Sequence, residues 1–285
     1  MIAVTGATGH LGRLVLAGLL EQVPAARLAA LVRTPSKAAG LAAGGVQVRE
    51  ADYAQPATLA AALQGVKTLL LVSSSEVGQR SPQHQAVIAA AKAAGVQLIA
   101  YTSILHADRS KLALAAEHLA TEQALRASGV PFALLRNGWY LENYTERLAG
   151  ALQHGFAGSA GSGRIAAAAR ADYAAAAVAV LTRPEQAGKV YELGGDAPFT
   201  MAELAAEVAR QSGKAVAYAD LPAAAYRGVL LGAGLPTAAA DIYVDADVNI
   251  ALGELDDRSG DLARLIGRPT TTLAAAVAAG LSGLR

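Results

Sequence analysis

A glycine-rich turn near the start of the chain constrains the fold more than any other feature of the sequence. Residues 5–12 read Thr-Gly-Ala-Thr-Gly-His-Leu-Gly, directly after an apolar run and directly before a helical pattern. Glycines leave the main chain free of Cβ atoms, so the phosphates of a dinucleotide can approach it closely. The N–H groups and positive dipole end of the next helix would face these phosphates. The predicted dinucleotide-binding turn consists of Gly6, Ala7, Thr8, Gly9, His10, Leu11 and Gly12, and the alternative is a plain strand–turn–helix connection.

The first half of the chain alternates between apolar, strand-like segments and helical segments. Runs such as Leu69-Leu70-Leu71-Val72 lack polar alternation, as is typical of strands that are covered on both faces. Helices between such strands imply parallel pairing and right-handed crossovers, so the predicted fold class is α/β with a doubly wound, Rossmann-type parallel sheet. We expect strands near residues 1–5, 28–33, 46–50, 67–73, 97–102 and 131–136, and helices near 12–22, 35–42, 57–63, 81–94 and 111–128.

Composition excludes several classes of function. With 24 basic and 23 acidic residues the net charge is +1, which gives no reason to expect a nucleic-acid partner. The chain has no cysteine, and its five histidines are scattered, so we expect no metal site. Apolar runs such as residues 174–181 stop well short of the roughly 18 residues that span a bilayer. With no export signal apparent, we expect a soluble, cytoplasmic protein without a membrane partner.

Three positions on the predicted sheet edge are candidates for binding the rest of the cofactor. Arg33 ends the second strand, where proteins that prefer NAD usually have an acidic residue. Its guanidinium suits a 2′-phosphate, which predicts NADPH as the cofactor, against the alternative of a solvated surface arginine. Asp52 follows the third strand and would accept a hydrogen bond from the adenine amino group, although a loop role without a ligand is equally consistent with its place. Ser73, Ser74 and Ser75 end the fourth strand, where the alternative is a simple strand-terminating turn.

The fifth and sixth strands end in residues that would line the nicotinamide half of the site. The fifth ends Tyr101-Thr102-Ser103, and Tyr101 is a candidate proton donor. After the sixth strand, Asn137 or Asn143 would orient the acceptor or hold the carboxamide. Trp139, Tyr140 and Tyr144 would form a flat apolar slot for a ring-shaped acceptor, unless they only pack a domain junction.

One proton-delivery motif is absent. No tyrosine has a lysine four residues later, so the chain lacks the Tyr-x-x-x-Lys pair that protonates a developing alkoxide. Quinones accept hydride readily and give a stabilised anion, so placement beside the nicotinamide would suffice for them.

Longer motifs resemble one family. The resemblance rests on Ser-Ser-Ser-Glu-Val-Gly-Gln-Arg at 73–80, Ala-Tyr-Thr-Ser at 100–103, Leu-Leu-Arg-Asn-Gly-Trp-Tyr at 134–140 and Arg-Ala-Asp-Tyr-Ala-Ala-Ala at 170–176. The chain is similar to the NmrA-like, atypical short-chain dehydrogenase/reductases, and within them to the bacterial NADPH-dependent quinone oxidoreductases of type 2. The resemblance implies NADP bound by residues 6–11, Arg33, Ser73–Ser75 and the segment Asn137, Gly138, Trp139, Tyr140, Leu141 and Glu142.

The resemblance also implies the activity. The expected function is a reductase that transfers hydride from NADPH to a quinone. Alternatives are a redox sensor that binds NADP(H) without turnover, and a reductase of another conjugated electrophile such as a triphenylmethane dye. We expect an NADP-binding Rossmann domain over residues 1–150 and a smaller α/β region over 151–285 that covers the substrate, with interleaved elements. The glycine-rich segment 155–163 is a candidate lid, and the oligomeric state stays open, with a homodimer among the choices.

Overall fold

The computed structural model describes residues 1–284, and in it the chain forms two compact units. The first unit contains residues 1–107, 116–137 and 170–191, and the second contains 108–115, 138–169 and the chain from 192 onward. The two units interleave along the sequence, because the chain leaves the first unit after Asn137 and returns at Arg170. Residues 170–191 supply a helix and part of a strand to the first unit, and therefore belong to it.

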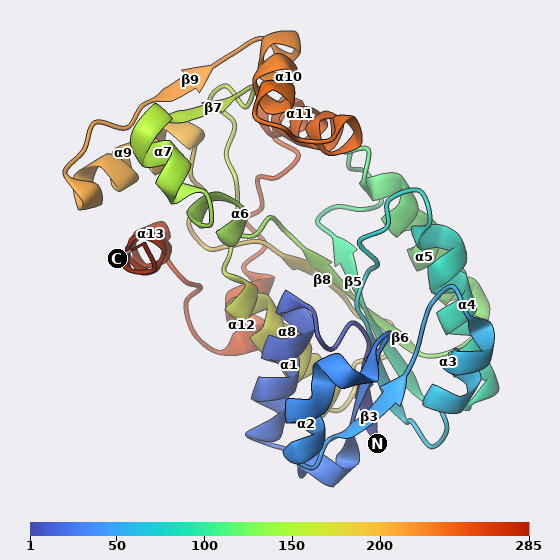
Figure 1. Ribbon diagram of the computed structural model, residues 1–285. Coiled ribbons are helices and arrows are strands. Elements are labelled where there is room, and N and C mark those ends of the chain that lie inside the picture. The colour runs from blue at the N-terminus through green and yellow to red at the C-terminus, as the bar shows by residue number, and fades with distance from the viewer. Residues whose placement is uncertain (285) are drawn as a thin grey trace. The chain divides into compact units, whose positions relative to one another are not determined.

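The first unit is built on a seven-stranded sheet with the order β3-β2-β1-β4-β5-β6-β8 (Figure 1). Every pair from β3 to β6 runs parallel, so the predicted doubly wound sheet is confirmed. Because β1 lies between β2 and β4, the order reverses beside β1, and ligands of such sheets bind at this point, beyond the carboxyl ends of the strands. The strands are β1 (Ile2–Val4), β2 (Leu28–Val32), β3 (Gln47–Glu50), β4 (Thr68–Leu71), β5 (Leu98–Ile104), β6 (Phe132–Asn137) and β8 (Val190–Leu193).

Helices cover both faces of this sheet. They are α1 (His10–Leu20), α2 (Ala39–Ala43), α3 (Pro56–Ala62), α4 (Arg80–Ala93), α5 (Ala115–Ser128) and α8 (Arg170–Thr182). Helices α1 and α8 lie side by side, and α3 packs against α4 (Figure 1). Gly18 permits the close approach of α1 to α8, since a Cβ built on it would lie 3.1 Å from Val178 Cγ2.

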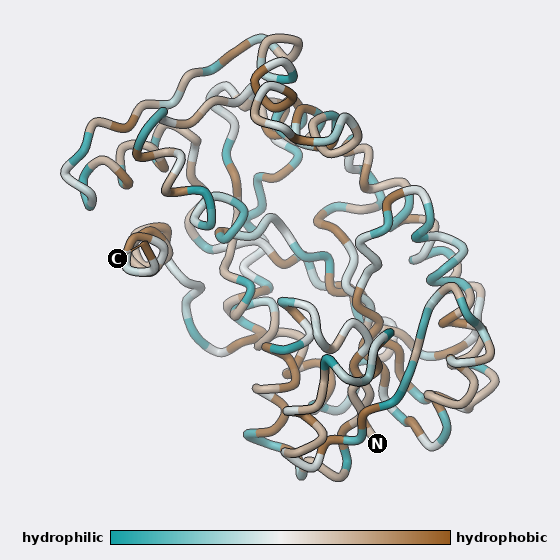
Figure 2. The backbone as a smooth tube through the Cα atoms, in the orientation of Figure 1, coloured by the Kyte–Doolittle hydropathy of each residue, from teal (hydrophilic) through white to brown (hydrophobic). Residues whose placement is uncertain are grey.

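A hydrophobic core of this unit lies between the sheet and the helices α3, α4 and α5. Leu69 and Leu71 of β4, Ile99 and Tyr101 of β5 and Leu134 of β6 point into it, at alternate positions along their strands. The intervening residues of β4, β5 and β6 are mostly buried as well, and the central part of the chain trace is largely hydrophobic (Figure 2). The apolar runs without polar alternation in the sequence arise from this burial on both faces.

The second unit consists mostly of helices. Its elements are α6 (Glu142–Thr145), α7 (Leu148–His154), β7 (Phe156–Gly158), α9 (Met201–Ser212), β9 (Tyr218–Asp220), α10 (Ala223–Gly232), α11 (Thr237–Ala251), α12 (Asp261–Ile266) and α13 (Leu273–Ser282). Strands β7 and β9 pair in parallel. Helix α9 has a capping box, in which Thr200 and Glu203 each bind the other's backbone N–H. In residues 1–284 no helix is long and apolar enough to cross a membrane.

The glycine-rich segment 155–163 is held by three successive backbone donors. Ser159 N donates to Asp247 Oδ2 at 2.9 Å, Ala160 N to the Tyr218 hydroxyl at 2.9 Å, and Gly161 N to Asp220 Oδ1 at 2.9 Å. Its first residues form β7. The segment is thus anchored to β9 and α11, and the idea that it acts as a lid stays a prediction.

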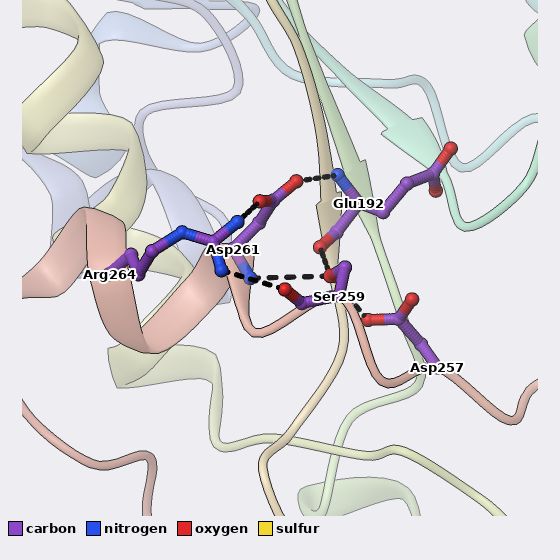
Figure 3. A network of polar contacts seen from close by, with 5 residues as sticks. All are labelled: Glu192, Asp257, Ser259, Asp261 and Arg264. Atoms are coloured by element: carbon purple, nitrogen blue, oxygen red, sulfur yellow. Dashed lines mark hydrogen bonds and ion pairs between the residues drawn. The ribbon is translucent and has the colours of Figure 1, made fainter.

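A polar network fixes the end of β8 to α12 in the second unit (Figure 3). The Ser259 hydroxyl lies 2.7 Å from Glu192 O and 2.8 Å from Asp257 Oδ2. Asp261 accepts a hydrogen bond from Glu192 N at 3.1 Å and is paired with Arg264. These contacts join residues that are 67 and 69 positions apart, so they tie α12 to the last residues of β8.

A buried ion pair joins α5 to the sheet of the first unit. Arg136 Nε donates to Glu122 Oε1 at 2.9 Å, and its Nη2 donates to Oε2 at 2.7 Å. The side chains are only 4% and 1% exposed. The Ser103 hydroxyl donates to Glu122 Oε1 at 2.7 Å. Removing one partner of such a buried pair leaves the other charge poorly compensated. Without Arg136, Glu122 would keep only the Ser103 hydroxyl and, 3.9 Å from its Oε2, the half-exposed Arg126 guanidinium.

Replacing one partner should therefore cost much more than replacing both. We expect Arg136→Met to lower the free energy of unfolding by about 3–5 kcal/mol, because the buried Glu122 side chain loses its bidentate partner. The double variant Arg136→Met/Glu122→Leu should recover most of this loss. Urea-induced unfolding followed by circular dichroism measures both; equal losses in the single and double variants would contradict the account.

Candidate functional site

The predicted glycine turn lies at the carboxyl end of β1. Gly6 has a φ of +57°, a left-handed conformation that favours glycine. A Cβ on Gly12 would lie 2.9 Å from Ala7 Cα, so only glycine allows α1 to start this close to the turn. The helix begins at His10, with Gly9 as N-cap and no side-chain cap. The local backbone thus has the conformation that the spacing of the glycines predicts.

This turn fits the pyrophosphate of a dinucleotide. Gly6, Gly9 and His10 are exposed, and the first hydrogen bond of α1 runs from Arg13 N to Gly9 O. The amides that precede Arg13 lie at the positive end of an 11-residue helix and are free of a capping side chain. These are the donors and the field that bind phosphate at helix N-termini.

A second contact fixes the strand ends beside the turn. Thr5 Oγ1 accepts a hydrogen bond from Val72 N at 2.9 Å and lies 3.1 Å from Leu70 O, so it bridges β1 to β4. The Tyr53 hydroxyl lies 2.6 Å from Thr5 Oγ1 and 2.8 Å from Val72 O. Burial raises the pKa of Tyr53, so its hydroxyl stays protonated and remains a donor. The turn therefore begins at a strand end whose Thr5 side chain is fixed by hydrogen bonds to the end of β4 and to Tyr53.

Arg33 is placed as predicted, directly after β2, and it has a partner that sequence reasoning missed. Its Nη1 lies 2.8 Å from Glu76 Oε1, and the two side chains are 66% and 46% exposed. Glu76 belongs to the segment after β4. An arginine that is this exposed keeps further N–H donors directed to solvent, where a 2′-phosphate can reach them.

Side chains from the core hold the main chain of the serine segment. Ser73 N donates to Thr102 Oγ1 at 2.8 Å, and Ser74 N donates to His84 Nε2 at 2.9 Å. Arg80 Nε donates to Ser74 O at 2.6 Å. The segment is more than a turn that ends a strand, because its backbone conformation is specified by three side chains from elsewhere in the fold.

His84 is the central residue of this arrangement. Because its Nε2 accepts the Ser74 N–H, its proton resides on Nδ1, which donates to Thr121 Oγ1 at 2.9 Å. Burial first, and the nearby Arg80 charge second, lower the pKa of His84 to about 4. The neutral form that accepts the Ser74 N–H is therefore the form present near neutral pH.

Tyr101 does not lie where a proton donor to a substrate would have to be. It is completely buried, and its hydroxyl lies 2.8 Å from His118 Nδ1. Its ring packs edge-on against His84 at 5.4 Å, within the core. Tyr101 follows Ile99 at the spacing that points both side chains to α4 and α5, so the prediction that Tyr101 delivers a proton is not supported by this geometry.

Asn137 ends β6 and carries an unsatisfied buried atom. Its main-chain oxygen accepts a hydrogen bond from Leu105 N at 2.9 Å, while its side-chain Oδ1 is buried and has no partner within the described chain. Buried polar atoms without a partner are rare and call for an explanation. A carboxamide group of a ligand is a suitable donor for this oxygen.

Asp52 stays a prediction. Its Oδ1 accepts a hydrogen bond from Ala54 N at 3.0 Å, and its Oδ2 accepts one from Gln55 Nε2 at 3.0 Å. This local turn accounts for an aspartate at this position without a ligand.

The segment that follows Asn137 belongs to the second unit and has a regular environment there. Gly138 N donates to Leu193 O at 2.9 Å, and Leu141 N donates to Ala168 O at 3.0 Å. The Tyr144 ring packs edge-on against Phe199 at 5.9 Å. The roles proposed for Asn143 and for the aromatic slot stay predictions. The polar and aromatic residues of the segment are all partly buried, and they are Trp139, Tyr140, Glu142, Asn143 and Tyr144.

Several residues that shape the site were not predicted. Main-chain groups at the strand ends are bound by the side chains of Thr5, Tyr53, Arg80, His84 and Thr102. Arg33 is paired with Glu76, and Glu76 is bound by Gln83. Glu76 and Arg80 lie in the motif 73–80, but nothing in its spacing shows which side chain reaches Arg33.

Comparison with known proteins also indicates a protein that binds NAD(P)H. Residues 6–184 match the NAD(P)H-binding family. The chain is 56% identical over 278 residues to Quinone oxidoreductase 2 of Escherichia coli K12, covering 97% of both chains.

Solved structures agree with this match. The crystal structure of the E. coli NADPH-dependent quinone oxidoreductase QOR2 with NADPH is 55% identical, covers 98% of this chain and 99% of its own, and has a TM-score of 0.96. Citrobacter sp. triphenylmethane reductase with NADP(H) is 38% identical, with 98% and 100% coverage and a TM-score of 0.95. The chain therefore belongs to the NAD(P)H-binding family, and its resemblance to the NmrA-like quinone reductases is confirmed.

Proposed function

We propose that this protein is an NADPH-dependent reductase that transfers a hydride to quinones. The observation that carries the proposal is the 56% identity to Quinone oxidoreductase 2 over 97% of the chain, together with a dinucleotide turn whose backbone has the required conformation. Arg33 at the end of β2 supports NADPH as the cofactor, because its exposed guanidinium suits a 2′-phosphate.

Different residues are proposed to bind different parts of the cofactor. The N–H groups in the first turn of α1, residues 10–12, would hold the pyrophosphate. Arg33 would hold the 2′-phosphate, and the backbone of Ser73–Ser75 the ribose and phosphate that cross the sheet edge. Asn137 Oδ1 would accept a hydrogen bond from the carboxamide, which would satisfy its buried oxygen. Residues 138–142 continue directly from Asn137 and are proposed to contact the same end of the cofactor.

Proton supply follows from what the chain lacks. When bound, NADPH supplies the hydride for reduction of the acceptor. The chain has no Tyr-x-x-x-Lys pair, and Tyr101 has its hydroxyl in the core beside His118. Quinone reduction leaves a stabilised anion, so we propose that water provides the proton. The residues proposed to orient the acceptor ring are Trp139, Tyr140, Asn143 and Tyr144.

A second acceptor class is supported by one comparison. The chain is 38% identical to Citrobacter triphenylmethane reductase over nearly its whole length. A triphenylmethane dye is, like a quinone, a conjugated electrophile that accepts hydride without an acid beside it. Dye reduction is therefore the second candidate activity.

The proposed activity is tested by following NADPH oxidation by its absorbance, with and without 1,4-benzoquinone, with NADH and a triphenylmethane dye in parallel. We expect rapid consumption that depends on the quinone and prefers NADPH. Faster turnover with the dye would favour the second candidate. Tight NADPH binding without turnover on any acceptor would overturn the enzyme and favour a sensor of the NADP(H) redox state.

The role of Arg33 is tested by Arg33→Ala. Loss of a charge-assisted contact to the 2′-phosphate should raise the KM for NADPH at least about tenfold and barely change that for NADH. Arg27→Ala, which removes an exposed arginine from the same unit, is the matched control. Equal changes for both cofactors would contradict the assignment of Arg33 to the 2′-phosphate.

Tyr101→Phe separates stability from catalysis. Because the Tyr101 hydroxyl contacts only the interior, we expect the variant to keep most of its kcat. The free energy of unfolding should fall by about 1–3 kcal/mol, because buried His118 Nδ1 loses its partner. Steady-state kinetics and urea unfolding measure the two effects; a hundredfold loss of kcat in a well-folded variant would restore Tyr101 as the acid.

A further inference from the structure

The Arg33–Glu76 ion pair crosses the start of the dinucleotide turn. Arg33 follows β2 and Glu76 follows β4, and in the sheet these two strands flank β1, from which the turn emerges. The pair, 2.8 Å between Nη1 and Oε1, therefore spans the sheet edge over the end of β1. The Glu76 carboxylate thus already forms an ion pair with the arginine that is proposed to bind the 2′-phosphate.

Hydrogen bonds to Gln83 and Ser74 hold Glu76 in this position. Gln83 Nε2 donates to Glu76 Oε2 at 2.7 Å, and Gln83 is 8% exposed on α4. Glu76 N also donates to Ser74 Oγ at 3.1 Å. One carboxylate oxygen binds the buried amide and the other faces Arg33, so the carboxylate is a built part of the site and not a freely moving surface charge.

We propose that Glu76 is a specificity-determining residue that weakens the preference for a 2′-phosphate over a 2′-hydroxyl. This inference rests on the proposed assignment of the 2′-phosphate to Arg33. A phosphate that binds Arg33 must displace or share the Glu76 carboxylate, and two negative groups then lie beside one guanidinium. A cofactor without the phosphate brings ribose hydroxyls, which can donate to Glu76 Oε1. Glu76 thereby keeps NADH usable by a site that otherwise suits NADPH.

The variant Glu76→Gln removes the charge with little change of shape. Gln83 Oε1 is buried and has no partner within the described chain, so the Gln83 amide can turn and accept a hydrogen bond from the new side-chain NH₂ group. The side-chain oxygen that remains in the variant would still accept a hydrogen bond from Arg33. Any change in binding would therefore report the lost charge.

Two fragments of the cofactor allow binding at its adenosine end to be measured without turnover. Isothermal titration with 2′,5′-ADP and with 5′-AMP measures the contribution of the 2′-phosphate directly, without a quinone. We expect Glu76→Gln to bind 2′,5′-ADP about 3- to 5-fold more tightly, the upper range for one partly exposed charge pair, and 5′-AMP equally or less tightly. The gain should shrink at high ionic strength, because both groups are solvent-accessible.

Controls separate charge from other effects. Glu21→Gln neutralises an exposed carboxylate at the end of α1 in the same unit and should leave both affinities unchanged. In the Arg33→Ala background, Glu76→Gln should have less than about a twofold effect, since no guanidinium is left to compete for. Glu76→Ala is a second neutral variant that should shift the ratio of affinities in the same direction.

The outcomes distinguish this inference from the assignment on which it rests. If Arg33→Ala abolishes the preference for 2′,5′-ADP while Glu76→Gln and Glu76→Ala leave it within about twofold of wild type, the role of Glu76 is wrong and the phosphate site stands. If Arg33→Ala also leaves the preference unchanged, both the phosphate site and the role of Glu76 are wrong.

Discussion

The hydrogen bond from Ser74 N to His84 Nε2 is the contact on which the arrangement of this site depends. The segment after β4 must leave the sheet beside the glycine turn, and a backbone there has no strand partner for its amides. His84 supplies the acceptor for Ser74, Thr102 that for Ser73, and Thr5 that for Val72. Each of these side chains lies in or next to a neighbouring strand or helix. Their hydrogen bonds of 2.8–2.9 Å therefore fix the position of the loop relative to the sheet.

This arrangement requires that the imidazole stay neutral. In water a histidine titrates near neutral pH, and a protonated ring has two donors and no acceptor. Burial in the core between Tyr53 and Tyr101 moves the pKa of His84 to about 4, so the acceptor nitrogen is available under ordinary conditions. The aromatic core that stabilises the sheet thus also determines the protonation state of the residue that orders the loop.

The sequence could predict those features that depend on the spacing of residues close together in the chain. The glycines at 6, 9 and 12 and the apolar strands identified the parallel sheet, its binding edge and the place of Arg33. The expected strand ends near residue 102, but β5 continues to Ile104, so Tyr101 lies in its middle, and the alternation along β5 points it inward with Ile99. Glu76 was missed because its contact with Arg33 joins residues 43 apart, and no period in the sequence encodes such a pair. Local spacing also does not show that α8 packs on α1, because most of the first unit's chain and part of the second lie between them in sequence.

That late return of the chain has a consequence for synthesis on the ribosome. Helix α1 is among the first segments to emerge, yet the face that it presents to α8 has no cover until residues 170–182 have been made. The intervening residues 138–169 belong to the other unit and must be made in between. Closing so long a loop is entropically costly and slow. The nascent first unit therefore has a helix α1 that lacks its α8 partner through more than half of its translation.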